Sequence, residues 1–592
     1  MKKKLYRLHR QLSIIIAVPV FLWASSGFMH PLMTNIRPAI ATQGWPAVAV
    51  DSSRLRVPLT AALRMHHLDS FANVRLVHID TNWFWQVQPV RRSGGVAAAV
   101  PGSGAGVAPG RLGVAGAGAG RGVAGAAAAS PAIQPTVPIY LSCTNGNVLP
   151  AGDWLYAQYL ARHFLEGGDV GGHAAPVHVV LASAHAAPAE TVPDCCGAAT
   201  ECVLNPARGA KVANVSLLNG YDNEYKSINR LLPVYRVTFD RPDGIRVYVE
   251  TTQDRFSFAM DNRRAVFDEI FRLFHTWGWL DGLGKGRIAV ELSFALLAFF
   301  TVLLGVVLFF STRAAKATNN PLVRTRRYHR YTAIFASLFT LFWSFSGGYH
   351  ALTKLIATEE GGGPVPANFA AAGFDYSKLQ AAVMQPITNL SLAKIEGTIY
   401  WRVCLQPVKG LESAKADGRK DLMKDGKVAF APVVYVNAKD YSVLHDGDRR
   451  YAASLASMFR GEHWVGVGAG AGSGAESGDV SDAGAGPGAL SVTPVTAFND
   501  EYNFTDKRLP VWRVSYPGAG HPRYYVETSS GQLAAFMNDA AYAEGYSFSV
   551  FHKHHFMDWA GKTVRDGSTM FWAVIQVLMV MIGLILYFRF RK

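Results

Sequence analysis

The chain has 592 residues, a formal net charge of +15 and a mean hydropathy of +0.11. This length exceeds that of a usual single domain, and the hydropathy is high for a soluble protein, so a small soluble domain is excluded. The positive charge does not call for a nucleic-acid partner, because part of it lies beside apolar stretches. The five cysteines lack zinc-finger spacing.

The first apolar stretch, 12–29, is long enough to be a membrane span. The basic residues Lys2, Lys3 and Lys4 before it resemble the start of a cleaved signal peptide. The motif around this stretch recurs inside the chain, where no signal cleavage acts. We therefore expect the segment to remain as a helix.

The long segment after this span contains two kinds of sequence. Two parts, 91–135 and 166–214, are rich in Gly and Ala and contain few large apolar residues, which predicts flexible loops. Two runs, 236–239 and 246–250, alternate around a Pro-Asp-Gly turn and predict paired strands. A helix is expected at 153–164. Small α+β modules are the predicted result.

Three more apolar stretches complete a set of four predicted spans. Basic residues stand before the first span, in the short loop between the second and third, and after the last. The positive-inside rule places all three sites in the cytoplasm. The sequence thus predicts a membrane protein with both termini in the cytoplasm. The expected boundaries are 1–32, 288–310, 331–350 and 570–588 for the spans, 33–287 and 351–569 for two exported segments, 311–330 for a cytoplasmic loop and 589–592 for a cytoplasmic tail.

The chain contains an internal repeat. His9 and His30, which stand 21 residues apart, recur 320 residues later as His329 and His350. An offset of 277 residues links further matches, which include 222–225 with 499–502, 232–237 with 509–514, 248–251 with 525–528, and His275 with His552. Strands are therefore also expected at 513–516 and 523–527, a helix at 451–459 and a Gly/Ala-rich loop at 466–490. The sequence predicts two halves, each made of a helix, an exported domain and a second helix.

The spacing of the repeated histidines suggests a role at the two membrane faces. Twenty-one residues of helix rise about 31 Å, close to the hydrocarbon thickness of about 30 Å. Histidine is a common ligand of metals and of haem iron. The alternative is that these are interfacial histidines that a duplication has kept.

The motif His-Arg…Trp…Ser-Gly-x-x-His resembles the PepSY-associated transmembrane helix family. The strand pair that ends in Tyr-Val-Glu-Thr, followed by Phe-His before the next span, is similar to the PepSY modules of that family. The resemblance implies an α-helical membrane protein with four transmembrane helices, two periplasmic α+β PepSY-like domains and an internal two-fold repeat. It also implies two b-type haems and the activity of a ferric-siderophore reductase.

Six repeated histidines are the candidate haem ligands. His9 and His329 are expected to hold an inner haem. His30 and His350 are favoured for an outer haem, with His275 and His552 as competing ligands. Two symmetric off-axis haems, held by His30 with His552 and by His275 with His350, are a further arrangement.

Other residues have weaker signals. Arg10 and Arg330 are candidates to bind haem propionates, because guanidinium groups bind carboxylates in a bidentate manner, or they are interfacial charges. Trp23 and Trp343 are expected to be packing residues, and His554 and His555 to be exposed. Trp277, Trp279 and Tyr225 are candidates to contact a substrate.

The predicted function is that of an inner-membrane haem b oxidoreductase. It would pass electrons from a cytoplasmic or quinol donor to a periplasmic ferric siderophore or other iron chelate, which releases the iron. No catalytic side chain is required for that reaction, because the cofactor carries the chemistry. The first alternative is a membrane-anchored PepSY protein that restrains a peptidase or senses a ligand. The second is a transporter, which the few charged residues within the spans disfavour.

Overall fold

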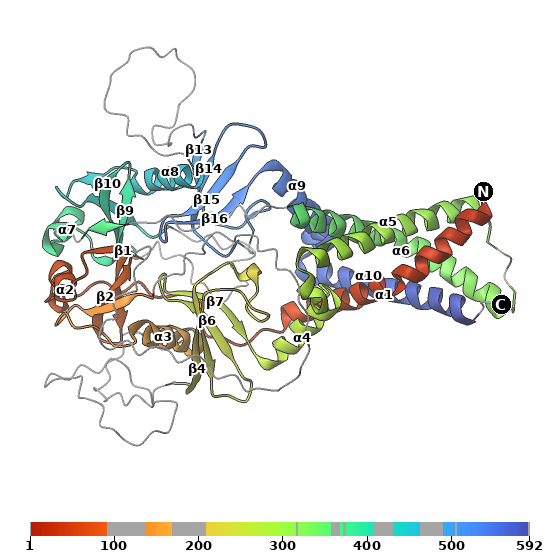
Figure 1. Ribbon diagram of the computed structural model, residues 1–592, viewed down its shortest axis with the longest axis horizontal. Helices are drawn as coiled ribbons and strands as arrows, with labels where there is room; N and C mark the ends of the chain where they lie inside the picture. Colours follow the sequence, from red (N-terminus) through yellow and green to blue (C-terminus); the bar gives the residue numbers. More distant parts are fainter. Residues whose placement is uncertain are drawn as a thin grey trace, which may run out of the picture.

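The computed structural model describes residues 2–90, 137–167, 209–314, 316, 318–356, 368–370, 374–407, 430–461, 489, 491–503 and 506–589. Most of the three predicted Gly/Ala-rich loops lies outside these residues, as do Cys195, Cys196 and Cys202. The molecule is elongated, with a bundle of helices at one end and the sheets at the other (Figure 1). Both ends of the chain lie at the far end of the bundle.

The bundle is formed by the long helices α1 (Lys2–Asn35), α5 (Lys285–Ser311), α6 (Pro321–Ile356) and α10 (Lys562–Arg589). Three of them, α1, α5 and α10, are long and apolar enough to cross a membrane. They contain three of the four predicted spans. Ile16, Ala17 and Val20 of α1 pack against Ala298 of α5 and Val580 of α10.

The fourth predicted span lies in α6, which does not reach the hydropathy of the other three helices. Small polar residues dilute its apolar stretch, and two of them, Thr340 and Ser346, are buried inside the bundle. The Thr340 hydroxyl donates to Oε1 of Gln576 on α10 at 2.8 Å. These polar side chains therefore serve contacts between helices, which explains why α6 is less apolar.

The described residues form four four-stranded antiparallel sheets, two for each half, and one strand of the first half's sheets comes from the second half. In the first half the elements are α2 (Leu59–Met65), β1 (Ser70–Ile79), β2 (Asn82–Pro89), β3 (Ile139–Ser142), α3 (Gly152–Glu166), β4 (Val212–Leu218), β5 (Val234–Phe239), β6 (Arg246–Glu250), β7 (Arg255–Met260), α4 (Asn262–Phe274) and the 3₁₀ helix η3 (Gly278–Leu283). In the second half they are β8 (Phe369–Ala370), α7 (Tyr376–Val383), β9 (Ile387–Ile395), β10 (Thr398–Leu405), β11 (Val433–Asn437), β12 (Val443–Leu444), α8 (Gly447–Phe459), β13 (Ser491–Val495), β14 (Val511–Ser515), β15 (Arg523–Glu527), β16 (Gln532–Met537), α9 (Asp539–Ser547), the π-helical turn η5 (Phe548–His552) and the 3₁₀ helix η6 (His555–Ala560).

The sheet orders are β3-β2-β1-β8, β4-β5-β6-β7, β12-β11-β10-β9 and β13-β14-β15-β16. The predicted strand pairs are confirmed as β5 with β6 and β14 with β15. The predicted helices are confirmed as α3 and α8. β4 begins at Val212, inside the stretch that was expected to be a loop, because its apolar residues pack on a neighbouring strand.

The two halves exchange segments near the far end of the sheets. β8, which follows α6, pairs with β1 of the first half. In return, the Val50 amide of the first half donates to the Ile387 carbonyl at 2.7 Å. The Asn73 side chain accepts from the Leu392 amide at 3.3 Å, and the Asn389 side chain accepts from the Leu76 amide at 3.1 Å. The halves therefore share one hydrophobic core and form a pseudo-dimer within one chain.

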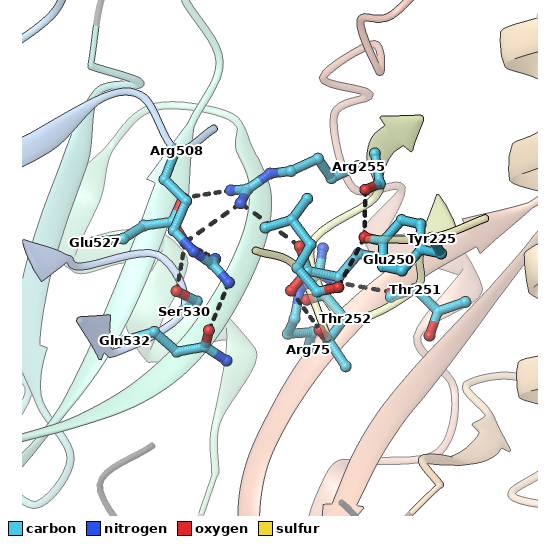
Figure 2. A network of polar contacts seen from close by, with 12 residues as sticks. Arg75, Tyr225, Glu250, Thr251, Thr252, Arg255, Arg508, Glu527, Ser530 and Gln532 are labelled. Carbon is cyan, nitrogen blue, oxygen red and sulfur yellow. Dashed lines mark hydrogen bonds and ion pairs between the residues drawn. The ribbon is translucent and has the colours of Figure 1, made fainter. Parts of the chain in front are cut away.

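A buried ionic network joins the two halves (Figure 2). It links the sheet β4-β5-β6-β7 to the sheet β13-β14-β15-β16. Glu527 of β15 is 1% exposed and binds Arg255 from the first half. Arg508 donates to the other Glu527 oxygen at 2.5 Å and to Gln532 at 2.6 Å. Burial alone would raise the pKa of Glu527, but the two arginines outweigh it and bring the pKa to about 2. This carboxylate is therefore ionised wherever the protein is folded near neutral pH.

Candidate functional site

His275 and His552 meet where the sheets join the bundle. His275 follows the last residue of α4, and His552 ends η5. The centres of their rings are 6.0 Å apart, with an angle of 82° between the ring planes. Each ring stacks on a phenylalanine four residues earlier, Phe271 or Phe548, at 4.5 Å. One equivalent histidine from each half thus lies at the pseudo-two-fold axis.

The repeated serines hold the Nδ1 side of these two rings. Nδ1 of His275 lies 3.0 Å from the Ser26 hydroxyl, and Nδ1 of His552 lies 3.2 Å from the Ser346 hydroxyl. Each serine donates its own proton to a carbonyl of its helix, Leu22 at 2.8 Å and Phe342 at 2.7 Å. With its proton on the helix carbonyl, each serine oxygen accepts from Nδ1, and on this basis we assign the proton of both imidazoles to Nδ1. Nε2 keeps its lone pair and is available to a metal.

The repeated tryptophans fix the backbone at the same two histidines. The Trp23 indole donates to the His275 carbonyl at 3.0 Å, and the Trp343 indole donates to the His552 carbonyl at 3.2 Å. Sequence reasoning treated both as packing residues and missed this role. The signal was their exact repetition together with Ser-Gly, which a purely apolar contact does not require.

Both central imidazoles are neutral. Burial lowers the pKa of His275 to about 4, with a smaller effect of His30 in the same direction. Burial and the neighbouring His275, Lys553 and other histidines lower the pKa of His552. A neutral imidazole is the form that binds a metal.

His30 and His350 flank the central pair. The His30 ring contacts Phe271 at 5.3 Å, and the His350 ring contacts Phe548 at 4.5 Å. Nδ1 of His350 is 2.5 Å from a Glu544 oxygen. The structure therefore brings all four outer histidines together, but the two that face each other at the axis are the ones that the sequence ranked second.

The inner histidines, His9 and His329, lie near the other end of the bundle. Nδ1 of His9 donates to the Thr301 carbonyl of α5 at 3.1 Å, which leaves Nε2 free. A Cβ atom added at Gly305 would lie 3.1 Å from Cε1 of His9, and one at Gly583 would lie 3.4 Å from Cε1 of His329. Each imidazole thus rests on a glycine of a facing helix.

The two candidate arginines differ in their surroundings. Arg330 donates to the Thr312 hydroxyl at 2.8 Å, to the Thr312 carbonyl at 2.6 Å and to the Phe309 carbonyl, and it stacks on the Phe309 ring. It therefore caps the end of α5, as basic residues do at helix C-termini. Arg10 is exposed. The contacts of Arg330 favour the interpretation as an interfacial charge over that as a propionate ligand.

Several other expectations were wrong. His554 is fully buried, because it stacks on Trp343 at 5.6 Å in the place that Trp277 takes on Trp23. Trp277 is 3% exposed and Tyr225 is 0% exposed, so neither can contact a substrate. Of the three aromatic candidates for that role, Trp279 is the exposed one, at 60%.

The site offers a pair of buried, neutral imidazoles as its donors. In the described part of the chain, no group of three or more His, Cys, Asp or Glu side chains is arranged to hold a metal ion. Two imidazoles that share one metal through metal–nitrogen bonds of about 2 Å have ring centres about 6 Å apart. The His275–His552 separation of 6.0 Å agrees with this value.

If this pair binds haem, Ser346→Ala should weaken that binding about 10- to 100-fold, because residues that orient a ligating histidine have effects of this size. Titration of the haem-free protein with haem measures the affinity. The control is Ser344→Ala, whose hydroxyl donates to the Thr340 carbonyl of the same helix at 2.6 Å. Equal affinities of the two variants would show that Ser346 does not orient His552.

Compared with models of protein families and with curated proteins, the sequence matches none of either.

Proposed function

We propose that this protein is a membrane haem b oxidoreductase that passes electrons across the bilayer to a ferric chelate, such as a ferric siderophore, on the side of the sheets. The observation that carries the proposal is the His275–His552 pair, with ring centres 6.0 Å apart and with both Nδ1 atoms held by serines. The resemblance of the repeated motif to the PepSY-associated family supports it.

The chain would supply ligands, spacing and exclusion of water. His275 and His552 would hold one haem at the outer face, and His9 and His329 would hold one at the inner face. Haem supplies one-electron chemistry when it is bound. Held by two histidines, the haem would be suited to electron transfer rather than to oxygen binding. The serines and tryptophans of the repeat would keep the outer imidazoles in the ligating tautomer and orientation.

The proposed topology rests on the positive-inside rule, applied to the long helices of the bundle. With α6 as a fourth span beside α1, α5 and α10, both ends of the chain and the basic α5–α6 loop would lie in the cytoplasm. The sheets would lie in the periplasm of a bacterium. The shared core of the two halves would then form one docking body for the iron chelate.

A spectrum of the purified full chain tests the proposal. We expect a Soret band that shifts on reduction with dithionite, as for a low-spin b-type haem. After removal of dithionite, addition of a ferric chelate should reoxidise the protein, with release of ferrous iron. Protein that stays colourless when it is made in haem-replete cells would favour the binding or regulatory alternative. Protein whose reduced haem is not reoxidised by the ferric chelate would refute the reductase activity, but the assignment of a haem would stand.

A further inference from the structure

Lys553 lies beside the outer histidines. It follows His552 directly, at the end of the π-helical turn η5. Its ammonium nitrogen is 5.2 Å from the centre of the Phe548 ring. That ring lies 4.5 Å from the His552 ring and 4.5 Å from the His350 ring. The charge of Lys553 acts on both His30 and His552.

Three other cations near the outer histidines have acidic partners. Lys562 binds Asp566 at 2.5 Å, Lys226 binds Asp268 at 2.5 Å, and Arg565 binds Asp558 at 2.5 Å. Within the residues that the structure describes, Lys553 has no carboxylate oxygen within 4.0 Å. Glu544 is near enough to act on it, but its carboxylate is bound to His350.

The first half has no counterpart of this charge. Thr276 stands at the equivalent position, and its hydroxyl donates to the Arg272 carbonyl at 3.1 Å. Lys553 is therefore not part of the scaffold that the two halves share. A partly buried ammonium without an anion costs free energy, so its presence at this place calls for a negative partner.

We propose that Lys553 binds an anionic oxygen group, a carboxylate or a phosphate, that comes from outside the protein and lies beside the His275–His552 pair. Two sources supply such a group here. One is a propionate of the outer haem, and this assignment rests on the proposed function. The other is the phosphate of a phospholipid in the adjoining leaflet, and that assignment does not depend on haem.

The test compares Lys553→Met, which keeps the apolar stem, with Lys553→Arg, which keeps the charge. Lys562→Met is the control, because it removes a nearby ammonium that already has a protein partner. Two quantities are measured on the full chain in detergent: the rate at which haem passes to an excess of a haem-scavenging protein, and the phospholipid that co-purifies, by native mass spectrometry.

If a propionate is bound, Lys553→Met speeds haem loss about 10- to 100-fold, as expected for a lost hydrogen bond to a charged group, and Lys553→Arg restores the slow rate. If a lipid phosphate is bound, Lys553→Met loses the anionic phospholipid while haem loss is unchanged. A Lys553→Met protein that matches the Lys562→Met control in both measurements overturns the proposal. Protein without any haem would refute the proposed function, and the lipid measurement would still decide whether Lys553 binds an anion.

Discussion

We expect His552→Ala to lose about half of the bound haem, and His275→Ala to lose the same half. If the two residues ligate one iron, either substitution breaks the same site, because a bis-histidine haem cannot keep its low-spin state with one ligand. The double variant should then be no worse than either single variant, since two residues that act as one unit are not additive. Haem content per chain and the low-spin spectrum measure the effect.

The flanking histidines give the matched controls. His30→Ala and His350→Ala should keep the full haem content, because their rings lie against Phe271 and Phe548 and not at the axis. A double His275/His552 variant that loses twice the haem of each single variant would instead support two off-axis haems. Haem loss in the His30 and His350 variants, with none in the other two, would instead support His30 and His350 as the outer ligands.

The second large effect concerns the ionic network between the halves. We expect Glu527→Gln to lower the free energy of unfolding of the sheets by about 3–5 kcal/mol, because it leaves Arg255 and Arg508 buried without their shared anion. Urea unfolding of the full chain in detergent, followed by tryptophan fluorescence, measures the change. The control is Glu396→Gln at the partly exposed pair with Arg450, where less than about 1 kcal/mol is expected.

The same carboxylate predicts an acid dependence. Its folded pKa of about 2 lies below the unfolded value of about 4.3, so its contribution is complete above the unfolded pKa. That contribution, about 3 kcal/mol, is lost as the pH falls from about 5 towards 2. The Glu527→Gln protein should lack this part of the acid sensitivity. An identical pH profile in both proteins would contradict the assigned role of Glu527.

Local sequence patterns predicted the elements well. Apolar length located α1, α5 and α10, and the alternating runs around a turn located β5, β6, β14 and β15. These signals depend on the period of each element and on the composition of a few neighbouring residues, which are readable without the rest of the chain. The two offsets of the repeat also identified His275 and His552 as equivalent residues.

Contacts between distant segments were decided by the tertiary structure. The sequence ranked His30 and His350 above His275 and His552, because spacing along one helix was the available measure. Packing of α4 and η5 against α1 and α6 instead brings the latter pair to the axis. The burial of His554, the capping role of Arg330 and the hydrogen bonds between β1 and β9 have the same origin.

The sequence by itself thus determined the duplicated plan, the apolar helices and the set of residues from which a cofactor site could be built. The tertiary structure alone decided which imidazoles lie together and which groups hold each ring. The physical reason is that the position of an imidazole depends on hydrogen-bond partners hundreds of residues away, such as Ser26 for His275. Periodicity along the chain contains no information about those partners.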